Sequence, residues 1–131
     1  MTIMRHYHLS GVPVAKARHR TVRYGPGMRT YDPKVDDATT AKWILKAQAR
    51  EAPLDGPLHV ALEFYFPSPK KGKRIYHVTK PDLDNCIKFI LDVGNGIIWA
   101  DDKQIVGLSA IKSYGDPRTE IVVEVVGEEK V

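Results

Sequence analysis

The sequence predicts an α+β fold, a two-layer sandwich in which two helices pack on a mixed, mostly antiparallel sheet of about four strands. Four segments have the composition or the alternation of strands, and two others carry apolar residues at helical spacing. Strands that follow one another, with helices to pack against them, are typical of this sandwich. The chain has 131 residues, 43% of them hydrophobic, so residues 1–131 are expected to form a single domain with one core.

The first predicted strand spans residues 3–11, where apolar and polar residues alternate weakly up to a glycine. Its histidines, His6 and His8, share one face and could bind a metal, but no third ligand is suggested nearby, so ordinary surface positions are favoured. The segment that follows is rich in Lys, Arg and turn formers. In it, the run YGPG joins two short β-prone stretches, which predicts a mobile basic arm or hairpin over about residues 13–31.

The first helix is predicted to begin with Asp32 as its N-cap and Pro33 as its first residue, and to end at Glu51 because Pro53 stops it. Trp43 lies within this helix and is expected to pack in the core, since a single Trp on a helix packs there more often than it offers a stacking platform. The residues that follow the helical period are Val35, Ala38, Ala41, Ile44, Leu45 and Gln48.

A second strand is predicted over residues 58–66, LHVALEFYF, where every second residue is apolar until Pro67 ends the run. A polar loop rich in Pro, Gly and Lys follows. The second helix is then predicted from Asp82 to Val93, and the run GNG at 94–96 stops it. Its inward stripe is expected to consist of Leu83, Cys86, Ile87, Ile90 and Leu91.

The last two strands, at 105–114 and 119–126, are joined by a Gly-Asp-Pro turn and predict a hairpin, and the tail over about residues 127–131 is expected to fray. Cys86 is the single cysteine, so no internal disulfide can form, and we expect it to be buried. No apolar stretch approaches the roughly 18 residues of a membrane span. The start lacks the apolar region of a signal peptide, so a soluble, cytoplasmic protein is expected.

The net charge of +4 is unevenly distributed along the chain. Residues 1–34 carry a net charge of +6 and residues 67–80 a net charge of +5, whereas residues 81–102 carry −4, from five Asp against Lys88. Basic surfaces favour polyanionic partners such as nucleic acid, although basic segments are often merely solvated. The acidic segment 81–102 is therefore unusual in a protein with a net positive charge and needs an explanation.

The acidic segment opens with Asp82 and Asp84 at the start of the second helix. Pro81 disfavours helical geometry in the residue before it, so the chain enters the helix extended and both carboxylates lie on one side. Asp84, Lys88 and Asp92 then follow at steps of four and form one polar stripe. Carboxylates at a helix N-terminus can serve as caps and offset the helix dipole, which explains one of these aspartates well and two tolerably.

Capping does not explain Asp101 and Asp102, which follow the apolar run IIWA. A chain that returns beside the second helix would bring a carboxylate back to the same place. Carboxylates at one site repel one another unless a cation is present, and Mg²⁺ is held by a few carboxylates while keeping positions open for phosphate and water. The residues favour metal-dependent phosphodiester chemistry. A Ca²⁺ or structural metal site and merely solvated acids stay open as alternatives.

The acidic segment also carries an extended motif. It comprises Lys80-Pro81-Asp82-Leu83-Asp84-Asn85, Lys88, Asp92, Asn95-Gly96 and Asp101-Asp102-Lys103-Gln104-Ile105. This motif resembles the signature of the RusA family of Holliday-junction resolvases, often encoded by prophages. The runs GVPVAKARHR, RTYDPK and PRTEIVVEV are similar to other parts of the family's sequences, so the resemblance covers most of the chain.

The resemblance implies a homodimeric, Mg²⁺-dependent endodeoxyribonuclease, with Mn²⁺ as a substitute ion, that recognises four-way DNA junctions in recombination and repair and nicks two opposing strands. No membrane and no small-molecule cofactor is expected as a partner. Asp82, Asp84 and Asp102 match the family's metal-binding, catalytic carboxylates, and Lys88 matches its essential lysine. For Lys88 the alternative is an ion pair with Asp84 one helical turn away.

Two further aspartates are expected to support the site without binding the metal. Adjacent residues of a strand point to opposite faces, so only one of Asp101 and Asp102 should enter the site, and the family pattern favours Asp102. Asp92 is expected to stabilise the helix. The resemblance and the charge together predict phosphate contacts from Lys16, Arg18, Arg20, Arg23, Lys70, Lys71, Lys73, Arg74 and Lys80.

Three other functions stay open at this point. A nuclease of the same chemistry could act on forks, flaps or other branched DNA, because selectivity depends on dimer geometry, and nothing in the sequence identifies the dimer interface. A junction-binding protein without catalysis is disfavoured, since pure binding would gain affinity by losing negative charge near the DNA. A structural metal-binding domain is the weakest alternative, because it leaves the two basic segments unexplained.

Overall fold

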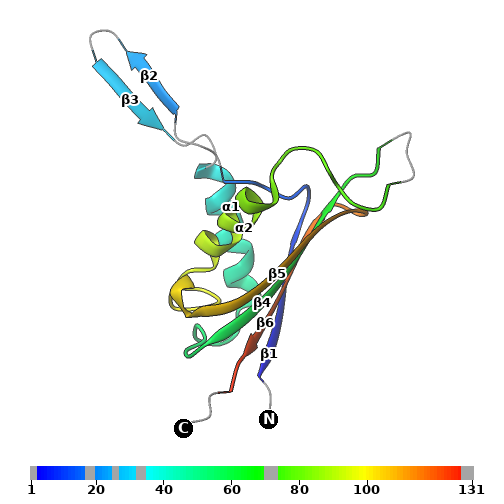
Figure 1. Cartoon of the computed structure of the whole chain (residues 1–131). Coiled ribbons are helices and arrows are strands. Elements are labelled where there is room, and N and C mark those ends of the chain that lie inside the picture. Colours follow the sequence, from blue (N-terminus) through cyan, green and yellow to red (C-terminus); the bar gives the residue numbers. More distant parts are fainter. Residues whose placement is uncertain (1–2, 17–19, 25–26, 32–34, 70–73, 128–131) are drawn as a thin grey trace.

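The computed structural model describes residues 3–16, 20–24, 27–31, 35–69 and 74–127 (Figure 1). The predicted N-cap and first residue of the first helix, Asp32 and Pro33, and most of the predicted frayed tail lie outside the described residues. In chain order the elements are β1 (Met4–Ser10), β2 (Arg20–Tyr24), β3 (Gly27–Tyr31), α1 (Val35–Gln48), β4 (Leu58–Phe66), α2 (Leu83–Gly94), η1 (Asp102–Gln104), β5 (Ile105–Tyr114) and β6 (Arg118–Val125).

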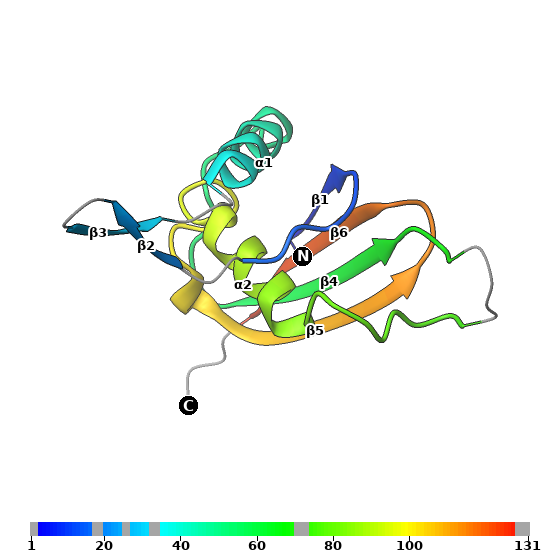
Figure 2. The same cartoon turned by 90° about the horizontal axis from the view of Figure 1, so that it is seen from above.

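The main sheet has four strands in the order β1-β6-β4-β5. β6 pairs antiparallel with β1 and with β4, and β4 pairs parallel with β5. Both helices cover the same face of this sheet, and no helix of the described residues lies on the opposite face (Figure 2). The predicted α+β sandwich, with two helices on a mixed, mostly antiparallel four-stranded sheet, is therefore confirmed.

The predicted hairpin of the last two strands is wrong, because β4 lies between β5 and β6. β4 carries five buried side chains on its helix-covered face, so it occupies the interior of the sheet, where both of its edges are paired. The 115–117 turn instead crosses the end of β4, and the Gly115 N–H donates a hydrogen bond to the Phe66 carbonyl (2.9 Å). The turn residues are compatible with either connection.

The predicted basic hairpin and the first strand are confirmed. β2 and β3 pair antiparallel and project away from the sandwich (Figure 1). In β1, Tyr7 and Leu9 are buried, whereas His6 and His8 are exposed. His6 Nε2 shares a hydrogen bond with the Glu120 carboxylate on β6, as an ordinary surface histidine can.

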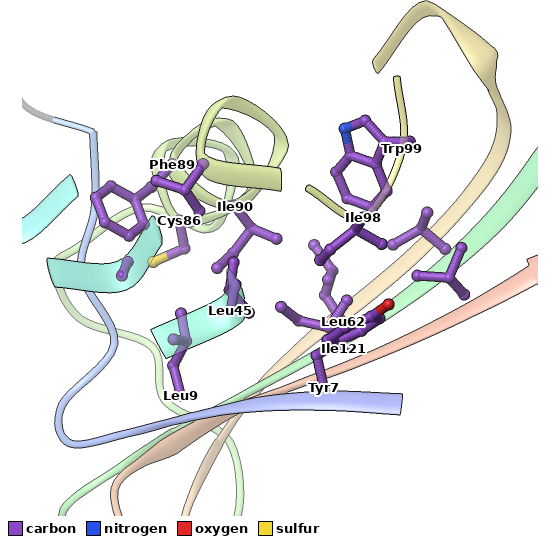
Figure 3. Close-up of a cluster of buried hydrophobic side chains, with 14 of the residues drawn as sticks. Tyr7, Leu9, Leu45, Leu62, Cys86, Phe89, Ile90, Ile98, Trp99 and Ile121 are labelled. Carbon is purple, nitrogen blue, oxygen red and sulfur yellow. The ribbon is translucent and has the colours of Figure 1, made fainter. Parts of the chain in front are cut away.

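The core lies between the two helices and the sheet (Figure 3). Its largest completely buried side chain is Trp99, which comes from the segment between α2 and η1. Cys86 is also fully buried, as predicted. The other completely or almost completely buried large side chains include Leu45, Leu58, Leu62, Phe64, Ile90, Ile98 and Ile121.

Trp43 does not pack in the core, contrary to the prediction, because 69% of its surface is exposed. Ala41 and Leu45 on either side of it occupy the buried face of α1, and position 43 falls on the opposite, solvent side. The helix also ends at Gln48, three residues before the predicted Glu51. The Gln48 side chain is bonded to the backbone of His8 on β1, so this end of α1 is tied to the edge of the sheet.

The buried face of α2 is turned relative to the predicted stripe. Cys86 and Ile90 are buried as expected, but Phe89 and Val93 complete the buried face, while the other predicted residues, Leu83, Ile87 and Leu91, are only partly buried. α2 packs against α1 as well as against the sheet, so its buried face lies between these two neighbours. None of the described helices has the length and apolar character of a membrane-spanning segment.

A tight turn after α2 fixes the path toward η1. The Gly94 carbonyl accepts hydrogen bonds from the backbone N–H groups of Ile97 (3.1 Å) and Ile98 (2.9 Å). The Trp99 indole Nε1 donates to Asn95 Oδ1 (2.9 Å). The turn thereby places Ile98 and Trp99 in the core and leads to η1, which contacts α2.

Candidate metal and DNA site

The N-terminus of α2 presents two aspartates to solvent. Asp82 is the N-cap residue, with an extended backbone (φ −67°, ψ 145°), but its side chain makes no capping hydrogen bond. Asp84 lies in the first turn, and both side chains are exposed. Capping therefore does not account for Asp82, and its carboxylate stays available to a ligand at a helix end that already favours negative charge.

Lys88 lies one turn after Asp84 on the same face of α2. Its Nζ is 3.7 Å from Asp84 Oδ2, and both side chains are more than half exposed. An exposed pair of this geometry stabilises a helix by only about 0.3–0.5 kcal/mol. The ion pair exists, but it holds neither side chain tightly, so both can turn toward a substrate.

Asp92, at the end of the same stripe, pairs with the basic arm. Lys16 Nζ is 2.8 Å from Asp92 Oδ2, and the Lys16 backbone N–H donates to the Asn85 carbonyl (2.9 Å). These two contacts attach the start of the arm to α2. Asp92 thus forms an ion pair with Lys16 in this structure, and its role at the site stays a prediction.

Asp101 and Asp102 have different surroundings. Asp101 is the N-cap of η1: its Oδ1 accepts from the Lys103 N–H (2.9 Å), and its own N–H donates to Gln104 Oε1 (2.9 Å), which closes a capping box. Gln104 Nε2 also donates to the Leu54 carbonyl (2.8 Å) and so ties η1 to the chain before β4. Asp101 shapes this turn, whereas the Asp102 carboxylate takes no part in the cap. That difference favours Asp102 as the ligand.

α2, which carries Asp84 in its first turn, and η1, which begins at Asp102, contact each other. Among the described residues, no three side chains of the His, Cys, Asp or Glu type stand close enough together to hold a metal ion. A common ion for Asp82, Asp84 and Asp102 therefore stays a prediction. The donor chemistry fits Mg²⁺ or Mn²⁺, because exposed carboxylate oxygens are the ligands that these hard cations bind in proteins.

Lys112 is a residue near this site that the motif did not indicate. It lies on β5 opposite Phe64, a buried position of β4, so its side chain projects toward the helices. Its Nζ donates to the carbonyls of Thr79 (2.8 Å) and Pro81 (2.6 Å), immediately before Asp82. The signal in the sequence was a lysine at a core-facing position of a predicted strand, which is unusual unless the charge has a partner.

Two buried groups next to Lys112 have shifted pKa values. Burial raises the pKa of the Cys86 thiol to about 11; the nearby positive charge of Lys112 opposes this effect, and the charges of Asp82 and Asp84 reinforce it. Burial lowers the pKa of His77, and the charge of Lys112 lowers it further. The neutral His77 ring stacks on Phe66, with ring centroids 3.8 Å apart.

His77 should make the protein less stable in acid. The pKa of His77 in the folded protein lies below the ordinary 6.5, so protonation of His77 favours the unfolded chain. The contribution of neutral His77 to the free energy of unfolding is therefore complete above about pH 6.5 and is lost as the pH falls. His77→Phe keeps an aromatic ring on Phe66 and removes the titration. We expect its free energy of unfolding in urea to fall less between about pH 7.5 and about pH 5.5 than that of the native protein.

The control for this prediction is His8→Phe, at an exposed position of β1. That variant should retain the native acid sensitivity. An equal loss of stability in His77→Phe and in the native protein would show that His77 is not the group that titrates.

The basic residues predicted to bind DNA are only partly placed. Arg74 and Lys80 are exposed in the segment that leads to α2. Arg20 and Arg23 lie on β2, of which the backbone is described. Arg18, Lys70, Lys71 and Lys73 lie outside the described residues.

Two comparisons with known proteins bear on this site. The family model described as "Endodeoxyribonuclease RusA" matches residues 10–124. The chain is also 31% identical over 131 residues to "Uncharacterized protein YqaN" of Bacillus subtilis (strain 168), an alignment that covers 88% of this chain and 92% of that protein. The family match spans α2, η1 and the basic hairpin, so it includes every part of the candidate site.

Proposed function

Because this chain belongs to the RusA family of endodeoxyribonucleases, we propose that it is a Mg²⁺-dependent, homodimeric nuclease that resolves Holliday junctions by paired nicks in opposing strands. The observation that supports this most is the N-terminus of α2, where an exposed N-cap aspartate makes no capping bond beside a second exposed aspartate and a lysine. A domain that only bound DNA would gain affinity without this negative charge.

In this proposal Asp82, Asp84 and Asp102 hold the metal ion. When bound, Mg²⁺ polarises the scissile phosphodiester and lowers the pKa of a coordinated water. The loosely paired Lys88 leaves Asp84 when DNA arrives and neutralises the charge that develops on the phosphate. Asp101 and Asp92 keep η1 and the basic arm in place, through the cap of η1 and the ion pair with Lys16.

The basic segments bind the phosphate backbone of the DNA and so bring it to the site. The β2–β3 hairpin projects from the sandwich, and the segment with Arg74 and Lys80 leads directly into α2, so positive charge reaches the site along the chain from two directions. Contacts of this kind neutralise phosphates without reading sequence, and they weaken steeply as salt rises. Selection of a four-way junction would then come from the spacing of two sites in a dimer.

The experiment that tests the function is cleavage of a labelled synthetic four-way junction, beside linear duplex, fork and flap substrates, with Mg²⁺, Mn²⁺ or EDTA. Paired nicks in the junction alone, absent with EDTA, would support the proposal. Equal cleavage of forks or flaps would replace it with a nuclease for other branched DNA. Tight, salt-sensitive junction binding without cleavage in either metal would identify a junction-binding protein instead.

Lys88→Met should separate binding from chemistry. The ion pair that this substitution removes is exposed and weak, so we expect unchanged stability and a junction Kd within about threefold of the native value. The cleavage rate should fall by roughly 10²–10³-fold, the usual cost of removing one group that stabilises transition-state charge. Gel-shift titrations in Ca²⁺ and single-turnover cleavage in Mg²⁺ measure the two quantities.

The matched control is Lys46→Met on the exposed face of α1, which removes a charge of the same kind elsewhere and should change neither quantity. If Lys88→Met weakens binding as much as it slows cleavage, Lys88 is a phosphate contact and has no role in the chemical step.

A further inference from the structure

Lys112 fastens the segment that leads into α2. Besides the two hydrogen bonds from its Nζ to Thr79 and Pro81, its own carbonyl accepts from the His77 N–H (3.2 Å). One residue of β5 therefore holds the segment 77–81 at three points. Between His77 and α2 this segment forms neither a helix nor a strand, so it has no regular hydrogen-bond ladder of its own.

The hydrogen bonds of the Lys112 ammonium require it to lose part of its hydration, and one of them is made directly before Asp82. A lysine ammonium is strongly hydrated, yet here its side chain is half-buried and is directed at two backbone carbonyls beside the Phe66 ring (6.0 Å). One of these carbonyls belongs to Pro81, the residue directly before Asp82. Because the Asp82 side chain makes no capping bond, the position of this residue depends on the backbone on either side of it.

We infer that Lys112 is a positioning residue for the metal-binding carboxylates: by holding the Pro81 carbonyl it sets the place of Asp82 at the start of α2. The inference rests on the proposed function, in which Asp82 binds the ion. The distances of 2.8 Å and 2.6 Å are those of charge-assisted hydrogen bonds, which are roughly twice as strong as neutral ones.

The test compares Lys112→Met with Lys46→Met, which removes an exposed lysine on α1, away from the site. The first readout is the affinity of the DNA-free protein for Mn²⁺ or Mg²⁺ alone, by isothermal titration calorimetry. The second is kcat and KM on the four-way junction. In Lys112→Met we expect metal affinity and kcat to fall about tenfold or more, with KM nearly unchanged. Native metal affinity and native kcat in Lys112→Met would overturn the inference.

Chemical rescue separates positioning from a general loss of folding. In Lys112→Cys, 2-bromoethylamine converts the introduced thiol into a thioether that carries an ammonium at nearly the length of lysine. The native Cys86 is fully buried, so alkylation is directed to the new thiol, and native protein treated in the same way is the control. Recovery of metal affinity and of kcat together supports the inference. Recovery of the native melting temperature without recovery of metal affinity overturns it.

These outcomes are distinct from those that decide the proposed function. If the native protein binds Mn²⁺ but cleaves no DNA, the nuclease proposal fails, while the calorimetric comparison still decides the role of Lys112. If the native protein cleaves junctions and Lys112→Met does so at the native rate and metal affinity, the nuclease proposal stands and Lys112 only fastens the loop.

Discussion

Asp82→Asn is expected to abolish junction cleavage while the junction stays bound. The substitution keeps the size of the side chain and removes the negative charge that a divalent cation needs, so the cleavage rate should fall by at least about 10²–10³-fold. The side chain makes no capping hydrogen bond, so the helix loses little, and the melting temperature should stay close to the native one. Single-turnover cleavage in Mg²⁺ and thermal unfolding measure both effects.

Junction affinity gives this prediction its second, independent readout. Removing a negative charge beside the DNA reduces repulsion, so the Kd measured in EDTA should stay equal or become smaller. Asp116→Asn, an exposed aspartate in the 115–117 turn, is the matched control and should cleave like the native protein. Cleavage by Asp82→Asn within about threefold of the native rate would contradict both the metal site and the role of Asp82 in it.

Gly94→Ala is expected to cause the largest loss of stability among substitutions at the end of α2. A Cβ atom at this position would lie 2.5 Å and 2.9 Å from two carbons of the Trp99 indole. That indole is completely buried and is held by a hydrogen bond to Asn95, so it has no room to move away. Overpacking of a rigid core site costs about 1–3 kcal/mol, and we expect about 3 kcal/mol here.

Urea unfolding measures this loss, with Gly127→Ala as the control. Apart from its chain neighbours, no atom of the described residues lies within 4 Å of a Cβ at position 127, so that variant should have the native free energy of unfolding. Because the 94–99 turn leads directly to Asp101 and Asp102, the surviving folded fraction of Gly94→Ala should also cleave more slowly per folded molecule. A free energy of unfolding within about 0.5 kcal/mol of native would show that the contact with Trp99 is not rigid.

Local patterns in the sequence predicted where helices and strands lie better than they predicted which strands pair with each other. Alternation placed β4 correctly, and helical spacing placed α2, because these periods depend only on which side of a segment is buried. The pairing of β5 with β6 was wrong because a Gly-Asp-Pro turn can close a hairpin or cross a neighbouring strand end equally well. The choice between these two connections depends on whether β4 pairs along both of its edges. That pairing involves residues far apart in the sequence, so no local pattern reveals it.

Side-chain environments were likewise predicted well where they depend on local spacing and poorly where they depend on contacts distant in sequence. The stripe of Asp84, Lys88 and Asp92 was predicted from helical spacing, and its exposure is confirmed. Trp43 was misplaced because its large apolar surface favours burial, whereas the phase of α1, set by Ala41 and Leu45, turns it to solvent. Lys112 is distant in sequence from the residues that it contacts, so no motif of fixed spacing could contain it.

The position of β6 affects when the sheet can form during synthesis of the chain. β6 follows the other described strands in the sequence, yet it lies inside the sheet between β4 and β1. Its pairing with β1 brings Met4 opposite Glu124. Contacts between such distant residues give a high contact order, and they can form only after β6 itself has been synthesised. A translation product that ends before β6 therefore carries the complete acidic motif without the sheet that positions it.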